Sequence, residues 1–170
     1  FDRAVRRYAA GILAPQRPLG QALAELVHRL HEDIAHVPGS ISPATTLAEV
    51  LTRREGTSQD LAGLAVGCLR LAGLPARCVS GYLVGGHPQT PPPPGPAKPA
   101  GADAVHAWVS VCVPQWGWVD LDPTHDRPTD DRYVVTAWGR DHADMLPLRG
   151  VVFTDGTEST LTVGVDVVRL

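Results

Sequence analysis

The sequence predicts an α+β domain in which helices come first and a mainly antiparallel sheet follows. Before Pro75 the apolar residues recur at helical spacing, whereas after it the chain breaks into short runs rich in Val, Trp and Tyr. A chain of 170 residues is long enough to bury a core of its own. We therefore expect a single domain over residues 1–170 with one active site.

Three helices are expected in the first half of the chain. Residues 19–35 carry an apolar stripe at helical spacing. Residues 46–55 read as a shorter helix, with Thr45 or Thr46 as its N-cap and Gly56 as its end. The third helix begins at residues 57–60 and is the most apolar of the three, so we expect it at the centre of the fold. Residues 19–85 would then form a helical lobe that ends in this central helix and the first strand.

The strands of the sheet are expected after Pro75. The four runs that predict them are residues 76–86, 105–113, 116–122 and 132–138. Two further strands are expected within residues 149–168, around an Asp155-Gly156 turn. Residues 86–103 are dense in proline, which favours an extended, solvated loop, so that residues 104–170 would hold most of the antiparallel sheet.

Charge and hydropathy argue against nucleic acid and membranes as partners. The 15 Lys and Arg residues are outnumbered by 18 Asp and Glu residues and are spread along the chain, so no nucleic-acid footprint is expected. No apolar run reaches the length of about 18–20 residues that spans a bilayer, and the first residues lack the features of a signal peptide. We expect no membrane partner and a cytoplasmic, bacterial location. The sequence does not specify an oligomeric state.

The cysteines and histidines give no metal or disulfide signature. Cys68, Cys78 and Cys112 lie in apolar runs without a CxxC spacing, which indicates buried free thiols. The seven histidines are scattered rather than paired at short spacing. We therefore expect neither a metal nor a cofactor.

Three residues form a candidate site for nucleophilic catalysis. Ser58 opens an apolar helix, where the helix dipole and free backbone N–H groups would stabilise a nucleophile or an oxyanion. His106 lies within a predicted strand and Asp122 ends the next one. A hairpin between these strands would place Trp108 opposite Asp122, on the same face as His106, so that Asp122 could fix the imidazole tautomer.

Each of these residues also has an ordinary structural interpretation. Serine at a helix start is usually an N-cap, a strand histidine is often a satisfied core residue, and aspartate before proline often starts a turn. The order nucleophile, base and orienting residue on helix, strand and strand makes the catalytic interpretation as good as the structural one.

Three sequence blocks resemble those of bacterial transglutaminase-like domains, which belong to the papain-like cysteine-enzyme superfamily. The stretch REGTSQDLAGLAVGCLRLAGLPARCVSGYL is similar to the helix that this family opens with Gly, any residue and Cys-Gln-Asp. The stretch AVHAWVSVCVPQWGWVDLDPTHD is similar to its histidine block and its aspartate block. The similarity runs from about Leu19 to the C-terminus and implies a papain-like transglutaminase core.

The resemblance also implies roles for individual residues. Ser58 occupies the nucleophile position, His106 that of the general base and Asp122 that of the residue orienting it. Gln59 and Asp60 belong to the nucleophile motif as supporting residues, and Trp108 could wall an apolar acyl tunnel, although aromatic residues in a sheet are more often core. The implied substrate is a peptide or protein amide, and the implied chemistry is acyl transfer without a cofactor.

The chain departs from the family pattern at position 58, where it has serine instead of cysteine. Cysteine can be held as a thiolate near neutral pH, whereas a serine hydroxyl must lose its proton during attack. The leading interpretation is a cysteine-type enzyme whose nucleophile has been exchanged for serine and which is inactive in this form. The alternatives are a natural pseudoenzyme that binds proteins and a true serine acyl transferase or hydrolase.

Overall fold

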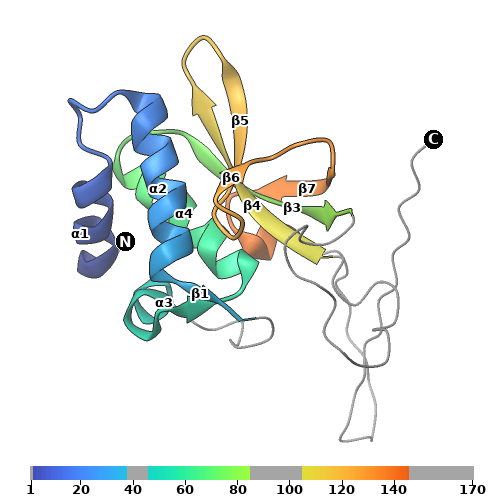
Figure 1. The fold of residues 1–170 in the computed structure, drawn as a ribbon, viewed down its shortest axis with the longest axis horizontal. Coiled ribbons are helices and arrows are strands. Elements are labelled where there is room, and N and C mark those ends of the chain that lie inside the picture. Colours follow the sequence, from blue (N-terminus) through green and yellow to red (C-terminus); the bar gives the residue numbers. More distant parts are fainter. Residues whose placement is uncertain (1, 38–45, 85–104, 146–170) are drawn as a thin grey trace, which may run out of the picture.

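A computed structural model describes residues 2–37, 46–84 and 105–145 of the chain. It has the α+β architecture that the sequence predicts, with a helical first half and an antiparallel sheet in the second half (Figure 1). The expected proline-rich loop and the two strands expected within residues 149–168 lie outside the described residues. No helix in the described part is long and apolar enough to cross a membrane.

Four helices form the helical half. They are α1 (Arg3–Ile12), α2 (Leu19–Asp33), α3 (Leu47–Arg53) and α4 (Ser58–Leu71). The helix α1 was not predicted, although its buried residues Val5, Ala9 and Ile12 have helical spacing and the carboxylate of Asp2 caps its first turn. Of the two N-cap candidates for α3, Thr46 is correct, since its side chain and that of Glu49 form a reciprocal capping box.

Within the described residues, the main sheet has five antiparallel strands in the order β6-β5-β4-β3-β7. Their bounds are β3 (Ala76–Leu83), β4 (Val105–Val113), β5 (Gly117–Asp122), β6 (Arg127–Pro128) and β7 (Tyr133–Gly139). A short 3-10 helix, η1 (His142–Met145), follows β7. The sequence predicted β3, β4, β5 and β7 of this sheet but not the two-residue strand β6. It also missed a separate two-stranded ladder of β1 (Ala35–His36) and β2 (Glu55–Gly56), whose residues Ala35 and Glu55 had been expected at helix ends.

The helix α4 is the centre of the core, as its apolar composition predicted. Nine of its 14 residues are buried, and it packs against β3 and β4. One side of the sheet contributes Val109, Val111 and Leu121 to the same apolar cluster. Alternate residues of a strand point to opposite faces, so His106, Trp108 and Asp122 belong to the other side of this sheet.

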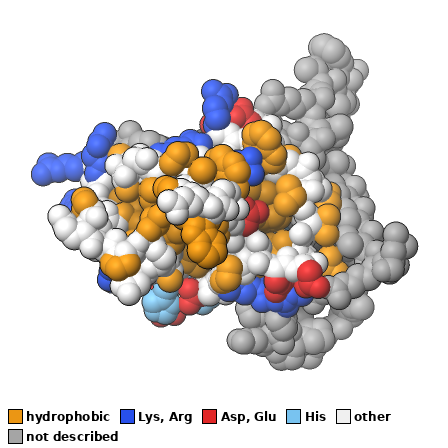
Figure 2. Space-filling model, turned by 90° about the horizontal axis from the view of Figure 1, so that it is seen from above, with side chains coloured by type: hydrophobic (Ala, Val, Ile, Leu, Met, Phe, Trp, Pro, Cys, Tyr) orange, Lys and Arg blue, Asp and Glu red, His pale blue; other side chains and the backbone are white. Residues whose placement is uncertain are grey.

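That second side carries several exposed aromatic side chains. Trp116 is 82% exposed, Trp138 61% and Trp118 47%. The guanidinium of Arg77 lies between two of them, 4.1 Å from the ring centre of Trp118 and 4.5 Å from that of Trp138. Figure 2 views the molecule from the end at which the β4–β5 hairpin projects and shows exposed hydrophobic side chains across it.

Candidate active site

Ser58 is the first residue of α4 and not its N-cap. Thr57 has the extended backbone of the cap, and the Asp60 carboxylate accepts hydrogen bonds from the Thr57 backbone N–H (2.8 Å) and hydroxyl. The capping interpretation of Ser58 is therefore wrong. Its side chain is buried and makes no hydrogen bond within the described residues. Position 58 thus places a small polar group beside the backbone N–H groups of a helix start, where negative charge is stabilised.

A short parallel ladder places His36 next to the segment that leads into α4. The strand β1 (Ala35–His36) pairs with β2 (Glu55–Gly56), so His36 lies opposite Gly56, two residues before Ser58. Burial lowers the pKa of His36, and the neighbouring His106 and His125 lower it further. His36 therefore feels the charge of both imidazoles, while its strand β1 pairs with the segment that leads into α4.

His106 and Asp122 form a buried hydrogen-bonded pair. His106 Nε2 lies 2.7 Å from Oδ2 of Asp122, with 7% of His106 and none of Asp122 exposed. The β4–β5 ladder pairs Val109 with Leu121, and its register continues to place Trp108 opposite Asp122, as the sequence predicted. The hairpin thus brings together two residues 16 positions apart in the chain.

The pair determines the tautomer of His106. A carboxylate accepts hydrogen bonds and donates none, so the ring proton lies on Nε2. In the neutral ring Nδ1 then carries the lone pair, and it makes no hydrogen bond to any described residue. A neutral imidazole with its lone pair on one defined atom is the form that a general base requires.

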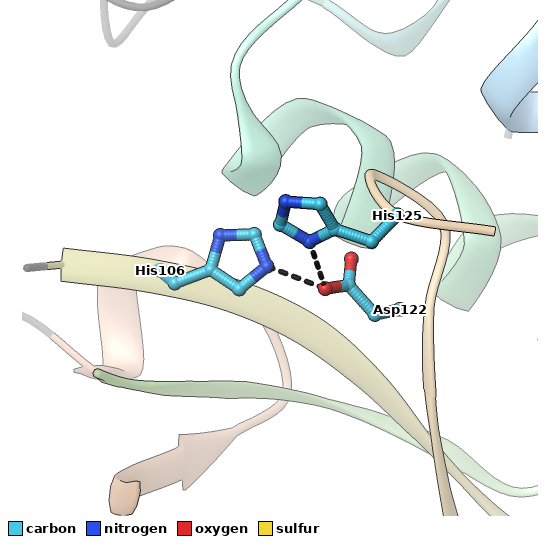
Figure 3. Close-up of side chains that lie close together, drawn as sticks. All are labelled: His106, Asp122 and His125. Atoms are coloured by element: carbon cyan, nitrogen blue, oxygen red, sulfur yellow. Dashed lines mark hydrogen bonds and ion pairs between the residues drawn. The ribbon is translucent and has the colours of Figure 1, made fainter. Parts of the chain in front are cut away.

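Asp122 holds further donors that the sequence did not reveal. His125 Nδ1 lies 2.6 Å from the same Oδ2 atom (Figure 3), and the hydroxyl of Tyr133 donates to it over 2.7 Å. Oδ1 accepts the backbone N–H of Thr124 over 2.8 Å. His125 was inside the quoted aspartate block, three residues after Asp122, which is the one signal that could have pointed to it.

These donors keep Asp122 ionised. Burial by itself would raise the pKa of this carboxyl, but the hydrogen bonds from His106 and His125 outweigh burial and hold the pKa well below its usual range. Burial, the charge of Asp122 and the hydrogen bond to it raise the pKa of Tyr133, which therefore stays a phenol that donates. A fixed negative charge at Asp122 stabilises the imidazolium that forms when His106 takes a proton.

The supporting residues have structural contacts in this site. Trp108 is fully buried, its ring stacks on that of His106 with centroids 6.2 Å apart, and its Nε1 donates to Asp120 over 3.1 Å. Trp108 is thus core packing behind the His106 ring. Asp60 is engaged in capping α4, and Gln59 is a half-buried residue of the same first turn.

One group of side chains has the donor atoms of a metal site. Within the described part of the chain, one nitrogen each of His106 and His125 and an oxygen of Asp122 lie within 4.8 Å of one another. No local sequence pattern pointed to this group, because its members lie 16 and three residues apart. The three cysteines are free thiols; Cys68 and Cys78 are buried as expected, whereas Cys112 is only half-buried.

Comparisons with known proteins agree with this architecture. An uncharacterized protein of Mycobacterium bovis, Mb2599c, is 47% identical over 169 residues, which cover 97% of this chain and 52% of that protein. A protein-glutamine gamma-glutamyltransferase of Pseudomonas aeruginosa is 36% identical over 118 residues, which cover 62% of this chain and 16% of that protein. The chain spans about half the length of the first of these relatives.

Solved structures share the fold. A candidate cysteine protease from Cytophaga hutchinsonii superposes with a TM-score of 0.67 at 21% identity, over 83% of this chain and 43% of that one. The periplasmic domain of TgpA from Pseudomonas aeruginosa superposes with a TM-score of 0.53 at 29% identity, over 73% of this chain and 43% of that one. The sequence model of the transglutaminase-like superfamily matches residues 6–123, a range that includes α4 and the His106–Asp122 hairpin. With its papain-like α+β core, the chain belongs to the transglutaminase-like superfamily.

Proposed function

We propose that this chain is a transglutaminase-like acyl-transfer domain that acts on peptide or protein amides, with Ser58 at the nucleophile position. His106 is its general base, and Asp122 orients that base. The observation that carries the proposal is the buried hydrogen bond of 2.7 Å between His106 Nε2 and Asp122 Oδ2. It leaves Nδ1 as the proton acceptor, which is the arrangement that activates a neighbouring nucleophile.

The reaction with cysteine at position 58 has two halves. His106 Nδ1 takes the thiol proton, the thiolate attacks the amide carbonyl, and the protonated imidazole returns its proton to the leaving nitrogen. The acyl group then passes from sulfur to an amine or to water, whose proton His106 accepts in turn. Backbone N–H groups in the first turn of α4 supply the donors that stabilise the oxyanion of each tetrahedral intermediate.

With serine at position 58, the first step of this reaction, formation of a thiolate, cannot take place. A free cysteine has a pKa near 8.5, and a helix start with a nearby imidazolium lowers it, so a stable thiolate can form. A serine hydroxyl must instead transfer its proton to His106 while it attacks. We therefore expect the Ser58 form to bind its amide substrate and to turn it over very slowly or not at all.

The family and one relative support the proposed substrate class. The protein-glutamine gamma-glutamyltransferase of Pseudomonas aeruginosa is named for chemistry at a glutamine side-chain amide. For this chain we propose an amide of a peptide or protein, with glutamine as the first to test.

A serine acyl transferase or hydrolase is the second candidate. The intact His106–Asp122 pair favours it, because a buried imidazole with an orienting carboxylate is also what a serine nucleophile requires. A binding-only pseudoenzyme is the third possibility, and it predicts a site that cannot be reactivated.

The test compares the chain with its Ser58→Cys variant, both in a Cys112→Ser background that removes the half-buried thiol. Iodoacetamide alkylation is followed against pH, and ammonia release is measured from a glutamine-containing casein digest. We expect the new thiol to titrate well below about 8.5 and to release ammonia, with no release by the Ser58 form. The Ser58→Ala and Ser58→Cys/His106→Gln variants are the matched controls.

Each other outcome selects a different function. Ammonia release by the Ser58 form that is lost in Ser58→Ala would establish a serine enzyme. An introduced thiol that titrates at or above about 8.5 without turnover would contradict the enzyme proposal and leave the binding module.

A further inference from the structure

His106, Asp122 and His125 form a three-donor set for a metal ion at the base itself. We propose that these side chains bind one divalent transition-metal ion, with Zn²⁺ as the probe, and that the bound ion switches the base off. The binding site stands on its own geometry, whereas its effect on turnover rests on the proposed function.

The donor atoms are already gathered around one carboxylate oxygen. His106 Nε2 lies 2.7 Å and His125 Nδ1 2.6 Å from Oδ2 of Asp122, and the three atoms all lie within 4.8 Å of one another (Figure 3). Bonds of about 2.0–2.2 Å to a tetrahedral ion set neighbouring donors about 3.3 Å apart. Each nitrogen would thus move about 0.6 Å away from the oxygen, a displacement that side-chain torsions can supply.

The chemistry of the donors selects the class of ion. Two imidazoles and one carboxylate suit Zn²⁺ and the other borderline divalent transition metals, and they suit Ca²⁺ and Mg²⁺ poorly because these prefer oxygen ligands. Three protein ligands leave a fourth position for water. Asp122 brings a negative charge, which offsets part of the charge of the ion.

Neighbouring groups hold the carboxylate in position. The backbone N–H of Thr124 donates to Oδ1 of Asp122 over 2.8 Å, and the hydroxyl of Tyr133 donates to Oδ2 over 2.7 Å. Such outer contacts orient a ligating carboxylate and increase metal affinity. The three donors come from β4, from the end of β5 and from the turn that follows it, so the β4–β5 hairpin and the turn after it carry the whole set.

The second histidine is what distinguishes this group from a simple base pair. Orienting His106 requires one carboxylate and one imidazole, and these are supplied by Asp122 and His106 alone. His125 adds a second imidazole nitrogen to the same oxygen, with its ring centre 5.0 Å from that of His106.

Metal binding and base catalysis exclude each other through the tautomer of His106. An imidazole nitrogen that coordinates a metal has no proton. The proton on Nε2 therefore moves to Nδ1 by exchange with solvent, and the proton of His125 moves in the same way from Nδ1 to Nε2, so that no net proton is lost. Nδ1 of His106 then carries a proton and can no longer accept one from the nucleophile.

The experiment titrates the chelator-treated Ser58 chain, in the Cys112→Ser background, with Zn²⁺ by calorimetry and with Co²⁺ by absorption spectroscopy. We expect one ion per chain and the visible bands of tetrahedral Co²⁺. His125→Asn and Asp122→Asn should each weaken binding by more than about 100-fold, and Tyr133→Phe by about 10-fold. His28→Asn is the matched control, because His28 bonds Asp126 outside the cluster, and it should bind as the parent does.

Two results would overturn the proposal. One is the absence of saturable Zn²⁺ binding by the parent chain. The other is an affinity that His125→Asn and Asp122→Asn leave unchanged although both variants keep the parent's circular dichroism. Both readouts are independent of turnover, so they separate this inference from the proposed function. In the Ser58→Cys variant, where the new thiol could itself bind metal, the expected inhibition by Zn²⁺ must be relieved by His125→Asn.

Discussion

The Nε2 atom of His106 lies 2.7 Å from Oδ2 of Asp122, and this one contact fixes which ring nitrogen can accept a proton. Both residues are buried, so little water competes for the bond. The same carboxylate also accepts His125 and Tyr133. The Asp122 carboxylate that orients the His106 ring is therefore held by a network rather than by a single pair.

Replacing Asp122 by Asn in the Ser58→Cys background should lower kcat by about 10³–10⁴-fold. An amide can donate to Nε2, which then carries the lone pair and leaves the proton on Nδ1, the wrong tautomer for the base. The measurement is ammonia release from a glutamine peptide, with unfolding curves as a check on folding. A loss of less than about tenfold would show that Asp122 does not orient the base.

The ionisation of Asp122 also predicts how stability depends on pH. Its pKa is lower in the folded chain than in the unfolded chain, where it is about 3.9, so the unfolded state binds more protons as the pH falls. The contribution is complete above that value and is lost at lower pH. We expect urea unfolding to show that the stability difference between the parent and Asp122→Asn shrinks as the pH falls below about 4. A difference that stays constant into this acid range would contradict the lowered pKa.

The buried cysteines predict a low background of thiol reactivity. Burial raises the pKa of Cys68 to about 12 and that of Cys78 to about 11, where Arg70 lowers it slightly and Asp141 raises it. At pH 8 both are almost entirely thiols, which react slowly. Mass spectrometry after iodoacetamide treatment should therefore find modification at Cys112 in the native chain and at all three cysteines in urea. Rapid native labelling of Cys68 would show that α4 is not packed as described.

The N-cap of α4, which is formed by Thr57 and Asp60 and not by Ser58, can be tested separately. The Asp60 carboxylate accepts two hydrogen bonds from Thr57, so Asp60→Ala should destabilise the chain by about 1 kcal/mol. Thr46→Ala, which breaks the equivalent box at α3, is the matched control and should cost about the same. Thermal unfolding measures both, and an Asp60→Ala variant as stable as the parent would rule out the cap.

How much the sequence could predict depended on the range of each contact. The strand β4 and the hairpin to β5 were predictable because alternation and a tight turn are local, and they fix Trp108 opposite Asp122. The contact of Tyr133 with Asp122 could not be predicted. The strand β7 reaches the site by pairing with β3, and no local sequence pattern encodes that pairing. The sequence left capping open as an alternative role for Ser58 because Ser and Thr are both good N-caps, and the hydrogen bonds from Thr57 to the Asp60 side chain identify Thr57 as the cap.

Gly81 connects the strand pairing to the site and gives the sharpest test of the packing. It pairs with His106 in β4 and lies beside an irregularity in the ladder with β7. A Cβ atom there would lie 2.0 Å from the carbonyl oxygen of Val134 and 2.8 Å from the ring of Trp108. The first neighbour is backbone, so the strands themselves would have to separate.

We expect Gly81→Ala to destabilise the chain by about 1–3 kcal/mol and to lower turnover in the Ser58→Cys background, because Trp108 stacks on His106. Gly63→Ala in α4 is the matched control. Its Cβ would meet a Leu47 methyl at an ordinary 3.5 Å, and alanine is the better helix former by about 1 kcal/mol. The free energy of unfolding, measured with urea, should therefore fall in Gly81→Ala and rise in Gly63→Ala. Equal stability of Gly81→Ala and the parent would show that β3 and β7 are not this close beside His106.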